Sequence, residues 1–380
     1  MRIFQNTKFD FLGSRKIAYA ISGALILIGL ISLAFRGLEY GIDFKGGTEI
    51  ALGFEKPIDI GKVRAELNKI GLGKVEVKTF GGETGVLVRT DLQEIPKDIY
   101  PKVVNKIEEA IKKLHPNVKY EVKEKTSNSI TFKFETPELA AQISNELFKE
   151  GFQTSKLEED NAHQTEVVVR VGIADWIKEN LKTMYADNSF QILKEEHVGP
   201  KIGKELKVDA IISIVLALIV ILIYLGFRFK FIFAVGAVAA LFHDVLITLG
   251  LFSLLYGVTD FLNLAININV VAAFLTLVGY SINDTVVVFD RVRENFKIHK
   301  TAPLKDNINN AINQTLPRTI ITSMTTWFVT LILLIFGGEV LRGFAFALFI
   351  GVMVGTYSSI FVASSLVYEY AKKGNKKISF

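Results

Sequence analysis

One acidic residue lies inside an apolar stretch of this sequence and is its best candidate for chemistry. Asp284 occurs in the motif GYSINDT, within the predicted membrane span 265–289. A charged side chain near the centre of a bilayer costs about 2.5–3.5 kcal/mol on insertion scales, and such acids often mark ion or proton paths. We therefore predict that Asp284 carries a proton. The structural alternative is a carboxylate that caps a neighbouring helix or forms a fixed ion pair.

A basic residue at the start of the next apolar stretch is a candidate partner for Asp284. Arg318, Thr322 and Thr326 recur every four residues, which predicts a polar stripe on one helix face. Asp284 lies six residues before Asp290, or roughly 9 Å along a helix, which is within reach of a long arginine. We predict a proton relay between Asp284 and Arg318. The alternative for Arg318 is a positively charged anchor at the membrane surface.

A second polar intrusion lies in the predicted span 231–256. His243 and Asp244 stand near the middle of this span, where they can join the same relay as Asp284. Hydrogen bonding between helices is the alternative role for polar side chains inside a membrane. The sequence leaves both interpretations of this pair open.

Small residues form the other recurrent pattern. In the span 343–368 they recur every four residues, which predicts a stripe for close helix packing that includes Gly351 and Gly355. Two further motifs, GIDFKGG at 41–47 and VGPKIG at 198–203, flank the polar part of the chain. Their glycines permit backbone conformations that other residues avoid. We interpret both motifs as shaped junctions, with a binding site as the alternative.

Six apolar stretches must position these residues. Half of the chain is apolar and the mean hydropathy is +0.34, as expected for a membrane protein with one sizeable extramembrane region. About 20 apolar residues are needed to cross a bilayer. The first stretch is too long for the apolar part of a signal peptide and is predicted to be a retained anchor. The predicted spans are 17–36, 209–227, 231–256, 265–289, 319–336 and 343–368.

Basic residues predict the orientation of these spans. They gather in the N-terminal segment 1–16, the turn after 227, the connection 290–318 and the tail 369–380. The positive-inside rule therefore puts both termini in the cytoplasm and the polar region 37–207 outside. Because the same rule accounts for the excess of five positive charges, we do not infer binding to nucleic acid.

The polar region alternates strand and helix patterns. It predicts an α+β domain built from two successive βαββαβ units, at about 48–120 and 121–198. The chain has no cysteine, and its histidines show no metal-ligand spacing. We therefore expect a binding or lever module without catalytic residues or a metal, and not an enzyme.

Four motifs closely resemble the SecF family. They are GIDFKGG at 41–47, VGP at 198–200, GYSINDTVVVFDRVR at 279–293 and QTLPRTIITS at 314–323. SecF is the smaller half of the bacterial SecD–SecF accessory complex of the Sec protein translocase, in the resistance-nodulation-division (RND) superfamily. The resemblance covers the six spans and their junctions. Its motif residues here are Gly41, Asp43, Phe44, Gly46, Gly47, Gly199, Pro200, Gly279 and Asn283.

The resemblance implies a fold, a site and partners. It implies half of an RND-type bundle in the bacterial inner membrane, with a ferredoxin-like periplasmic domain. A separate SecD chain would be the obligate partner; the SecYEG channel, SecA and preprotein would be functional partners, and YidC and YajC further ones. SecD–SecF would use the proton-motive force to complete translocation after the SecA step, with Asp284 as proton carrier and Arg318 as its facing arginine. The coupling ions are protons or sodium ions, with no cofactor.

Two alternatives compete with this interpretation. One is a subunit of an RND-type small-molecule exporter, and the other is a scaffold that steadies the translocon without transporting anything. The polar region is also longer than the single ferredoxin-like unit usual in the family, so the second unit is the additional part.

Overall fold

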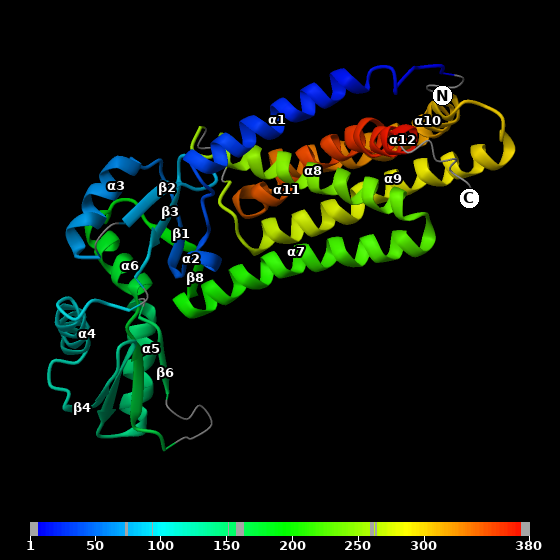
Figure 1. Cartoon of the computed structure of the whole chain (residues 1–380). Coiled ribbons are helices and arrows are strands. Elements are labelled where there is room, and N and C mark those ends of the chain that lie inside the picture. The colour runs from blue at the N-terminus through cyan, green and yellow to red at the C-terminus, as the bar shows by residue number, and fades with distance from the viewer. Residues whose placement is uncertain are drawn as a thin grey trace. The chain divides into compact units, whose positions relative to one another are not determined.

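The chain forms a helical unit and a polar unit. The structure, a computed structural model, describes residues 7–373 except 73–74, 93, 151, 157–162, 259–261 and 263. The helical unit comprises Met1–Asp43 and Glu205–Phe380, and the polar unit comprises Phe44–Lys204 (Figure 1). The outermost parts of the predicted cytoplasmic ends, 1–6 and 374–380, lie outside the described residues.

Six long helices build the helical unit, and all six are long and apolar enough to cross a membrane. The last one continues from α11 through a π-helical turn (Ser359–Ala363) into α12 (Ser364–Lys373). The helices are α1 (Arg15–Phe35), α7 (Pro200–Arg228), α8 (Phe231–Leu255), α9 (Ile268–Ile298), α10 (Leu304–Phe336) and α11 (Gly338–Ser358).

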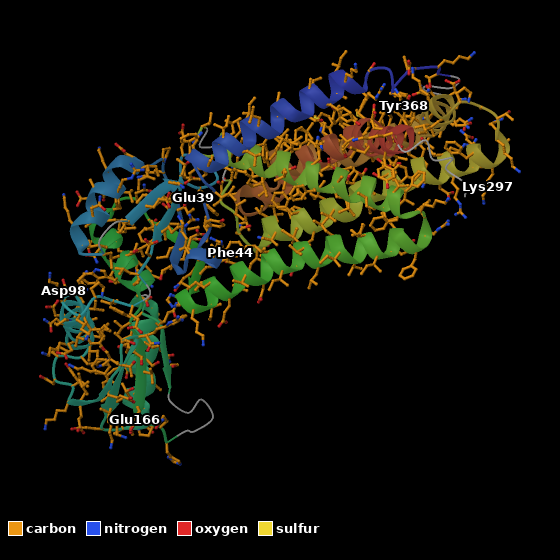
Figure 2. The ribbon with its side chains drawn as sticks, in the orientation of Figure 1. Glu39, Phe44, Asp98, Glu166, Lys297 and Tyr368 are labelled. Atoms are coloured by element: carbon orange, nitrogen blue, oxygen red, sulfur yellow. The ribbon has the colours of Figure 1, made fainter. Side chains whose placement is uncertain are left out.

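The helices extend well beyond the predicted spans. The predicted connection 290–318 is mostly helical: α9 continues to Ile298, past Lys297 (Figure 2), and α10 already begins at Leu304. Pro317 lies inside α10 and does not end it. Hydropathy identifies only the part of a helix that must lie in hydrocarbon, whereas the polar extensions here are held by tertiary contacts. For example, Asn309 and Asn313 of α10 hydrogen-bond the backbone of residues 9 and 12.

Two four-stranded antiparallel sheets form the polar unit, as the α+β prediction required. The first has the strand order β2-β3-β1-β8 and the second β4-β5-β7-β6. Helix α3 (Ile60–Leu67) joins β1 to β2, α4 (Tyr100–Leu114) follows β3, α5 (Pro137–Glu150) joins β5 to β6, and α6 (Ile173–Met184) precedes β8. The strands are β1 (Gly47–Phe54), β2 (Val75–Thr79), β3 (Gly85–Thr90), β4 (Tyr120–Lys125), β5 (Ser129–Phe134), β6 (Thr154–Lys156), β7 (Glu166–Arg170) and β8 (Phe190–Val198).

The two predicted units exchange their last strands. Two self-contained βαββαβ units would pair β4 with β1 and β8 with β5. Instead β8 pairs with β1, and β4 pairs with β5. The division at about 120 is therefore corrected: the second sheet is inserted between β3 and α6 of the first. Local sequence patterns predict that a strand exists but not which strand it pairs with. Strand β4 is largely charged and exposed and β6 has only three residues, so the sequence pattern of both strands is weak.

Asp175 is a buried acid in the first turn of α6. Its Oδ2 accepts a hydrogen bond from the Gly172 N–H at 3.2 Å, and Lys178 Nζ lies 3.7 Å from its Oδ1. Burial raises the pKa of Asp175 from 3.8 to about 6. Because the folded state then binds the proton more tightly than the unfolded state, this contribution to stability is present at low pH. It is lost as the pH rises from about 4 to about 6.

We expect Asp175→Asn to stabilise the polar unit at neutral pH by up to about 3 kcal/mol, because each pKa unit corresponds to about 1.4 kcal/mol. The gain should vanish near pH 4, where the native acid is protonated. Urea unfolding followed by the fluorescence of the adjacent Trp176, in a Trp327→Phe background, measures this. Asp187→Asn, at an exposed position, is the control. An equal effect of Asp175→Asn at both pH values would contradict the assignment.

Candidate intramembrane carboxylate site

Helix α9 carries Asp284 on its buried face. The helix is capped at its start, where Asn267 Oδ1 accepts a hydrogen bond from Val270 N at 2.9 Å and Asp43 Oδ2 accepts one from Ile268 N at 2.8 Å. Leu277, Ser281, Asp284 and Val288 then follow at helical spacing and are all buried. Asp284 is only 4% exposed.

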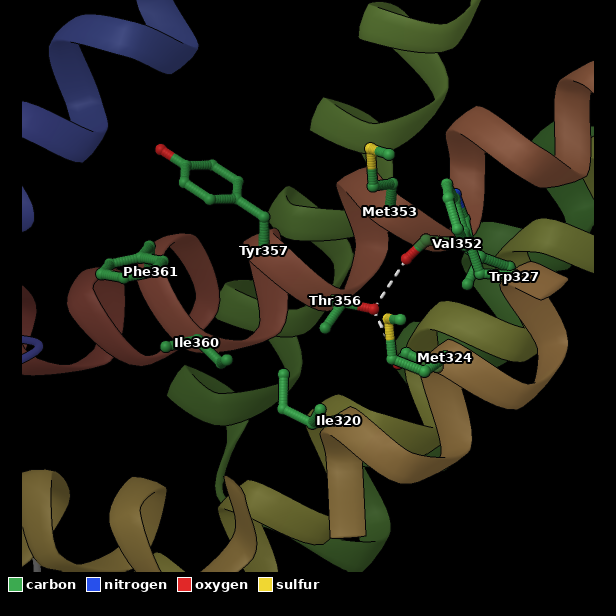
Figure 3. Close-up of a pocket in the computed structure, with 10 residues that line it drawn as sticks. Ile320, Met324, Trp327, Val352, Met353, Thr356, Tyr357, Ile360 and Phe361 are labelled. Atoms are coloured by element: carbon green, nitrogen blue, oxygen red, sulfur yellow. Dashed lines mark hydrogen bonds between the residues drawn. The ribbon is translucent and has the colours of Figure 1, made fainter. Parts of the chain in front are cut away.

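A hydroxyl group from α10 contacts this carboxylate, and a hydroxyl group from α11 contacts that hydroxyl in turn. Ser323 of α10 donates a hydrogen bond to Asp284 Oδ2 at 3.1 Å. Thr356 of α11 lies 2.7 Å from Ser323 Oγ and also 2.7 Å from the carbonyl of Val352 (Figure 3). Polar contacts therefore link Asp284 of α9 to α10 directly and to α11 through Ser323.

Sequence analysis missed Ser323 and Thr356. It placed the polar face of α10 along Arg318, Thr322 and Thr326, but that face is only partly buried or exposed. The buried polar face lies one residue further on, at Thr319 and Ser323. A four-residue spacing identifies a stripe on a helix but not which of several neighbouring stripes faces inward.

Arg318 is exposed and forms no ion pair with Asp284 within the described part of the chain. It lines a cavity of about 360 Å³ together with Arg228, Asp290 and Arg291. Asp290 lies 3.6 Å from Arg228, and Arg291 is paired with Glu294. The predicted pairing of Arg318 with Asp284 is thus not made in this structure, and the relay between them stays a prediction.

A larger and mostly apolar cavity of about 390 Å³ lies between α10 and α11 (Figure 3). Met324 and Trp327 line it from α10, and Met353 and Tyr357 line it from α11. Ser323 and Thr356 also line it, so this cavity reaches the Ser323 hydroxyl that contacts Asp284 and the Thr356 hydroxyl bonded to Ser323.

His243 and Asp244 are buried in α8 and form a separate network. Asp244 Oδ1 lies 2.9 Å from His243 Nδ1, and Asp244 Oδ2 accepts hydrogen bonds from Ser281 at 2.7 Å and Ser358 at 2.8 Å. The described residues show no direct hydrogen bond between Asp244 and Asp284. Ser281 and Asp284 nevertheless share the buried face of α9, three residues apart.

The glycines of the two junction motifs, at 41–47 and 198–203, allow close contacts and unusual conformations of the backbone. Gly41 donates its N–H to Ile266 O at 2.7 Å, next to the start of α9. Gly46 and Gly47 have φ values of +78° and +121°, which residues other than glycine rarely adopt. In the VGPKIG motif, a Cβ on Gly203 would lie 3.2 Å from the carbonyl of Phe44. Gly199 accepts the Gly203 N–H, and Pro200 begins α7.

The small-residue stripe of α11 packs against α9. A Cβ on Gly351 would lie 2.5 Å from Leu277 Cδ1, and one on Gly355 would lie 2.9 Å from Ser281 Oγ. Gly355 thus lets α11 approach the polar groups around Asp244. Gly279 and Asn283 lie on the opposite, exposed face of α9, and a Cβ on Gly279 would meet nothing within 4 Å.

Comparisons with known proteins bear directly on this arrangement. Residues 177–373 match the family described as protein export membrane protein SecD/SecF, C-terminal, and residues 31–58 match the SecD/SecF GG motif. The protein translocase subunit SecF of Rhodothermus marinus is 41% identical over 97% of this chain and 95% of its own length. The chain belongs to the SecF family. The SecF subunit of Calditerrivibrio nitroreducens is 38% identical over 96% of this chain and 95% of its own.

A solved structure gives the same result at the level of the fold. The structure of SecDF from Thermus thermophilus, a translocon-associated membrane protein, is 30% identical and has a TM-score of 0.65. It matches 98% of this SecF-family chain, which spans only 40% of the SecDF chain.

We expect Gly355→Ala to destabilise the helical unit by about 1–3 kcal/mol, because the added methyl overpacks the contact between α11 and Ser281. The melting temperature in detergent, followed by tryptophan fluorescence, measures this. Gly279→Ala is the matched control, since the same change in a helix meets open space there. Equal melting temperatures for the two variants would refute close packing at Gly355.

Proposed function

We propose that this SecF-family subunit couples proton movement through Asp284 to the completion of protein export. The supporting observation is that Asp284 is a buried carboxylate in a membrane-spanning helix, contacted by a serine hydroxyl and unpaired with any cation in the described residues. A buried acid without a fixed counter-ion changes charge readily when its surroundings change. Each charge that crosses the membrane field gains roughly 2.3 kcal/mol per 100 mV, enough to bias a two-state movement of the bundle.

The partner in this proposal is a separate SecD chain. The exposed face of α9 carries Ala272, Thr276, Gly279 and Asn283, whereas a face in contact with lipid usually carries large apolar residues. Small and polar residues are typical of contacts between helices inside membranes. The SecDF chain, of which this chain spans only part, supports the same pairing.

The setting of the proposal is the bacterial inner membrane. Both termini would be cytoplasmic and the polar unit periplasmic, as the basic residues predict. SecYEG, SecA and preprotein would be the functional partners, with YidC and YajC as further ones, and the step would follow ATP-driven insertion by SecA. The subunit would act without enzymatic chemistry or a cofactor.

Asp284→Asn should abolish the proton-driven part of export while leaving the ATP-driven part intact. The experiment uses proteoliposomes that contain SecYEG, SecA, SecD and this subunit, with a preprotein trapped part-way across the membrane. After ATP is removed and a pH gradient is imposed, the readout is the rate at which translocation of this preprotein is completed. We expect at least a tenfold loss of rate, since a 100 mV potential corresponds to roughly 50-fold per proton.

Asp209→Asn is the matched control for this experiment, because Asp209 is an acid in the membrane-spanning α7 but is exposed. If Asp284→Asn retains gradient-driven export, the coupling role is wrong and a scaffold without transport is favoured.

Gly279→Leu should weaken the association with SecD, because a large side chain fills the small-residue face of α9. Co-purification of tagged SecD with the variant, relative to the native chain, measures this, and we expect a loss of about tenfold, or roughly 1.4 kcal/mol. Gly226→Leu in α7 is the control, since that glycine also has open space around its Cβ. Full recovery of SecD with Gly279→Leu would exclude this face as the interface.

A further inference from the structure

Helices α1 and α8 meet along a parallel seam of three contacts. Ser22 Oγ lies 3.0 Å from His243 Nε2, and Ser32 Oγ lies 2.8 Å from Ser253 Oγ. Between them, a Cβ on Gly29 would lie 3.0 Å from Gly250 Cα. All three pairs have the same sequence offset of 221 residues. One contact of the seam therefore contains a titratable group, one contains only hydroxyls, and one is backbone packing.

The titratable contact belongs to a chain of hydrogen bonds across three helices. His243 bridges Asp244 and Ser22, at 2.9 Å and 3.0 Å. Ser22 Oγ lies 3.1 Å from the Tyr357 hydroxyl of α11, which donates to the Ala18 carbonyl of α1 at 2.8 Å. His243 is 6% exposed and Asp244 is 1% exposed, so both side chains are shielded from solvent.

Counting hydrogens shows which charge state fits this geometry. The chain has four contacts: Asp244–His243, His243–Ser22, Ser22–Tyr357 and Tyr357–Ala18. When the His243–Asp244 pair holds its proton, four hydrogens serve these four contacts, wherever in the pair that proton sits. When the pair loses it, the ionised carboxylate and neutral imidazole leave three hydrogens for four contacts. One contact must then open, and three of the four attach α1 to its neighbours.

The surroundings contain few other charges. Helix α8 has no other titratable residue, and the π-helical turn has none. Tyr357 of α11 closes the chain, Asp284 of α9 lies three residues beyond Ser281, and Tyr19 of α1 precedes Ser22 by three residues. The remaining charged groups on the packed helices lie near helix ends, among them Arg15 with Glu369 and Arg342 with Glu339. In the described residues no lysine or arginine pairs with Asp244.

We propose that His243 and Asp244 form a second proton-binding site, distinct from Asp284, whose occupancy controls how tightly α1 is held against α8 and α11. With the proton bound, Ser22 is held by both helices. On loss of the proton the part of α1 around Ala18 and Ser22 loosens, while the Gly29 and Ser32 contacts keep the rest of the seam closed. Helix α1 leads directly along the chain to Gly41–Gly47 and the polar unit. The proposal holds whether or not Asp284 carries a coupling proton.

Spin labels can follow this movement in the full chain, because it has no native cysteine. Ile17 of α1 and Val329 of α10 are exposed and take the labels as cysteine variants. Double electron–electron resonance in lipid nanodiscs then gives the distance distribution. We expect a single population near pH 5 and a second, displaced population that grows severalfold towards pH 9, because loss of the shared proton leaves three hydrogens for the four contacts. An unchanged distribution would overturn the proposal.

Matched variants separate this site from its neighbours. Ser22→Ala and His243→Gln should each remove the pH dependence, whereas Ser32→Ala, on the same helix and in an equally hydrogen-bonded pair, should keep it. The dependence should also persist in Asp284→Asn. If it disappears in Asp284→Asn, or equally in Ser32→Ala, the site is not His243–Asp244. A shift that follows replacement of potassium by sodium at constant pH would show that the ligand is sodium and not a proton.

Discussion

The cost of keeping carboxylates away from water is the constraint on which this structure depends. Asp244 and Asp284 are both buried in helices long and apolar enough to span a membrane, where an unsatisfied charge is costly. Each is met by hydroxyl groups from neighbouring helices: Ser281 and Ser358 at Asp244, and Ser323 at Asp284. These hydroxyl groups donate hydrogen bonds in place of water but carry no charge of their own. The acids can therefore be accommodated and still change their protonation state.

Close helix packing brings those hydroxyls within reach. Helix α11 supplies Thr356 to one network and Tyr357 and Ser358 to the other, so three consecutive residues serve both acids. This is only possible because Gly351 and Gly355 let α11 lie directly against α9. The small residues and the acids are therefore two parts of one arrangement.

The sequence predicted what depends on composition and local pattern, and missed what depends on tertiary pairing. Six apolar stretches and the acid Asp284 are visible in the sequence because both are defined by hydropathy. The inward face of α10 was misplaced by one residue, so Ser323 was overlooked and Arg318 was expected to contact Asp284. The exchange of β4 and β8 was also missed. Strand β8 pairs with β1, more than a hundred positions away, and β4 pairs with the neighbouring β5, and a local pattern does not decide between such partners. The Asp244 network was left open because its partners Ser22, Ser281 and Ser358 lie on three other helices.

Infrared difference spectroscopy of the subunit in lipid, recorded between low and high pH, tests most directly whether Asp284 carries a proton. A protonated carboxylic acid has a C=O stretching band that an ionised one lacks, and the chain can be compared with its Asp284→Asn variant. The account predicts that one component of the carboxylic acid band that appears on acidification of the native chain is missing from Asp284→Asn, while the components of the other acids remain. A band unchanged by Asp284→Asn would show that this residue does not bind the proton.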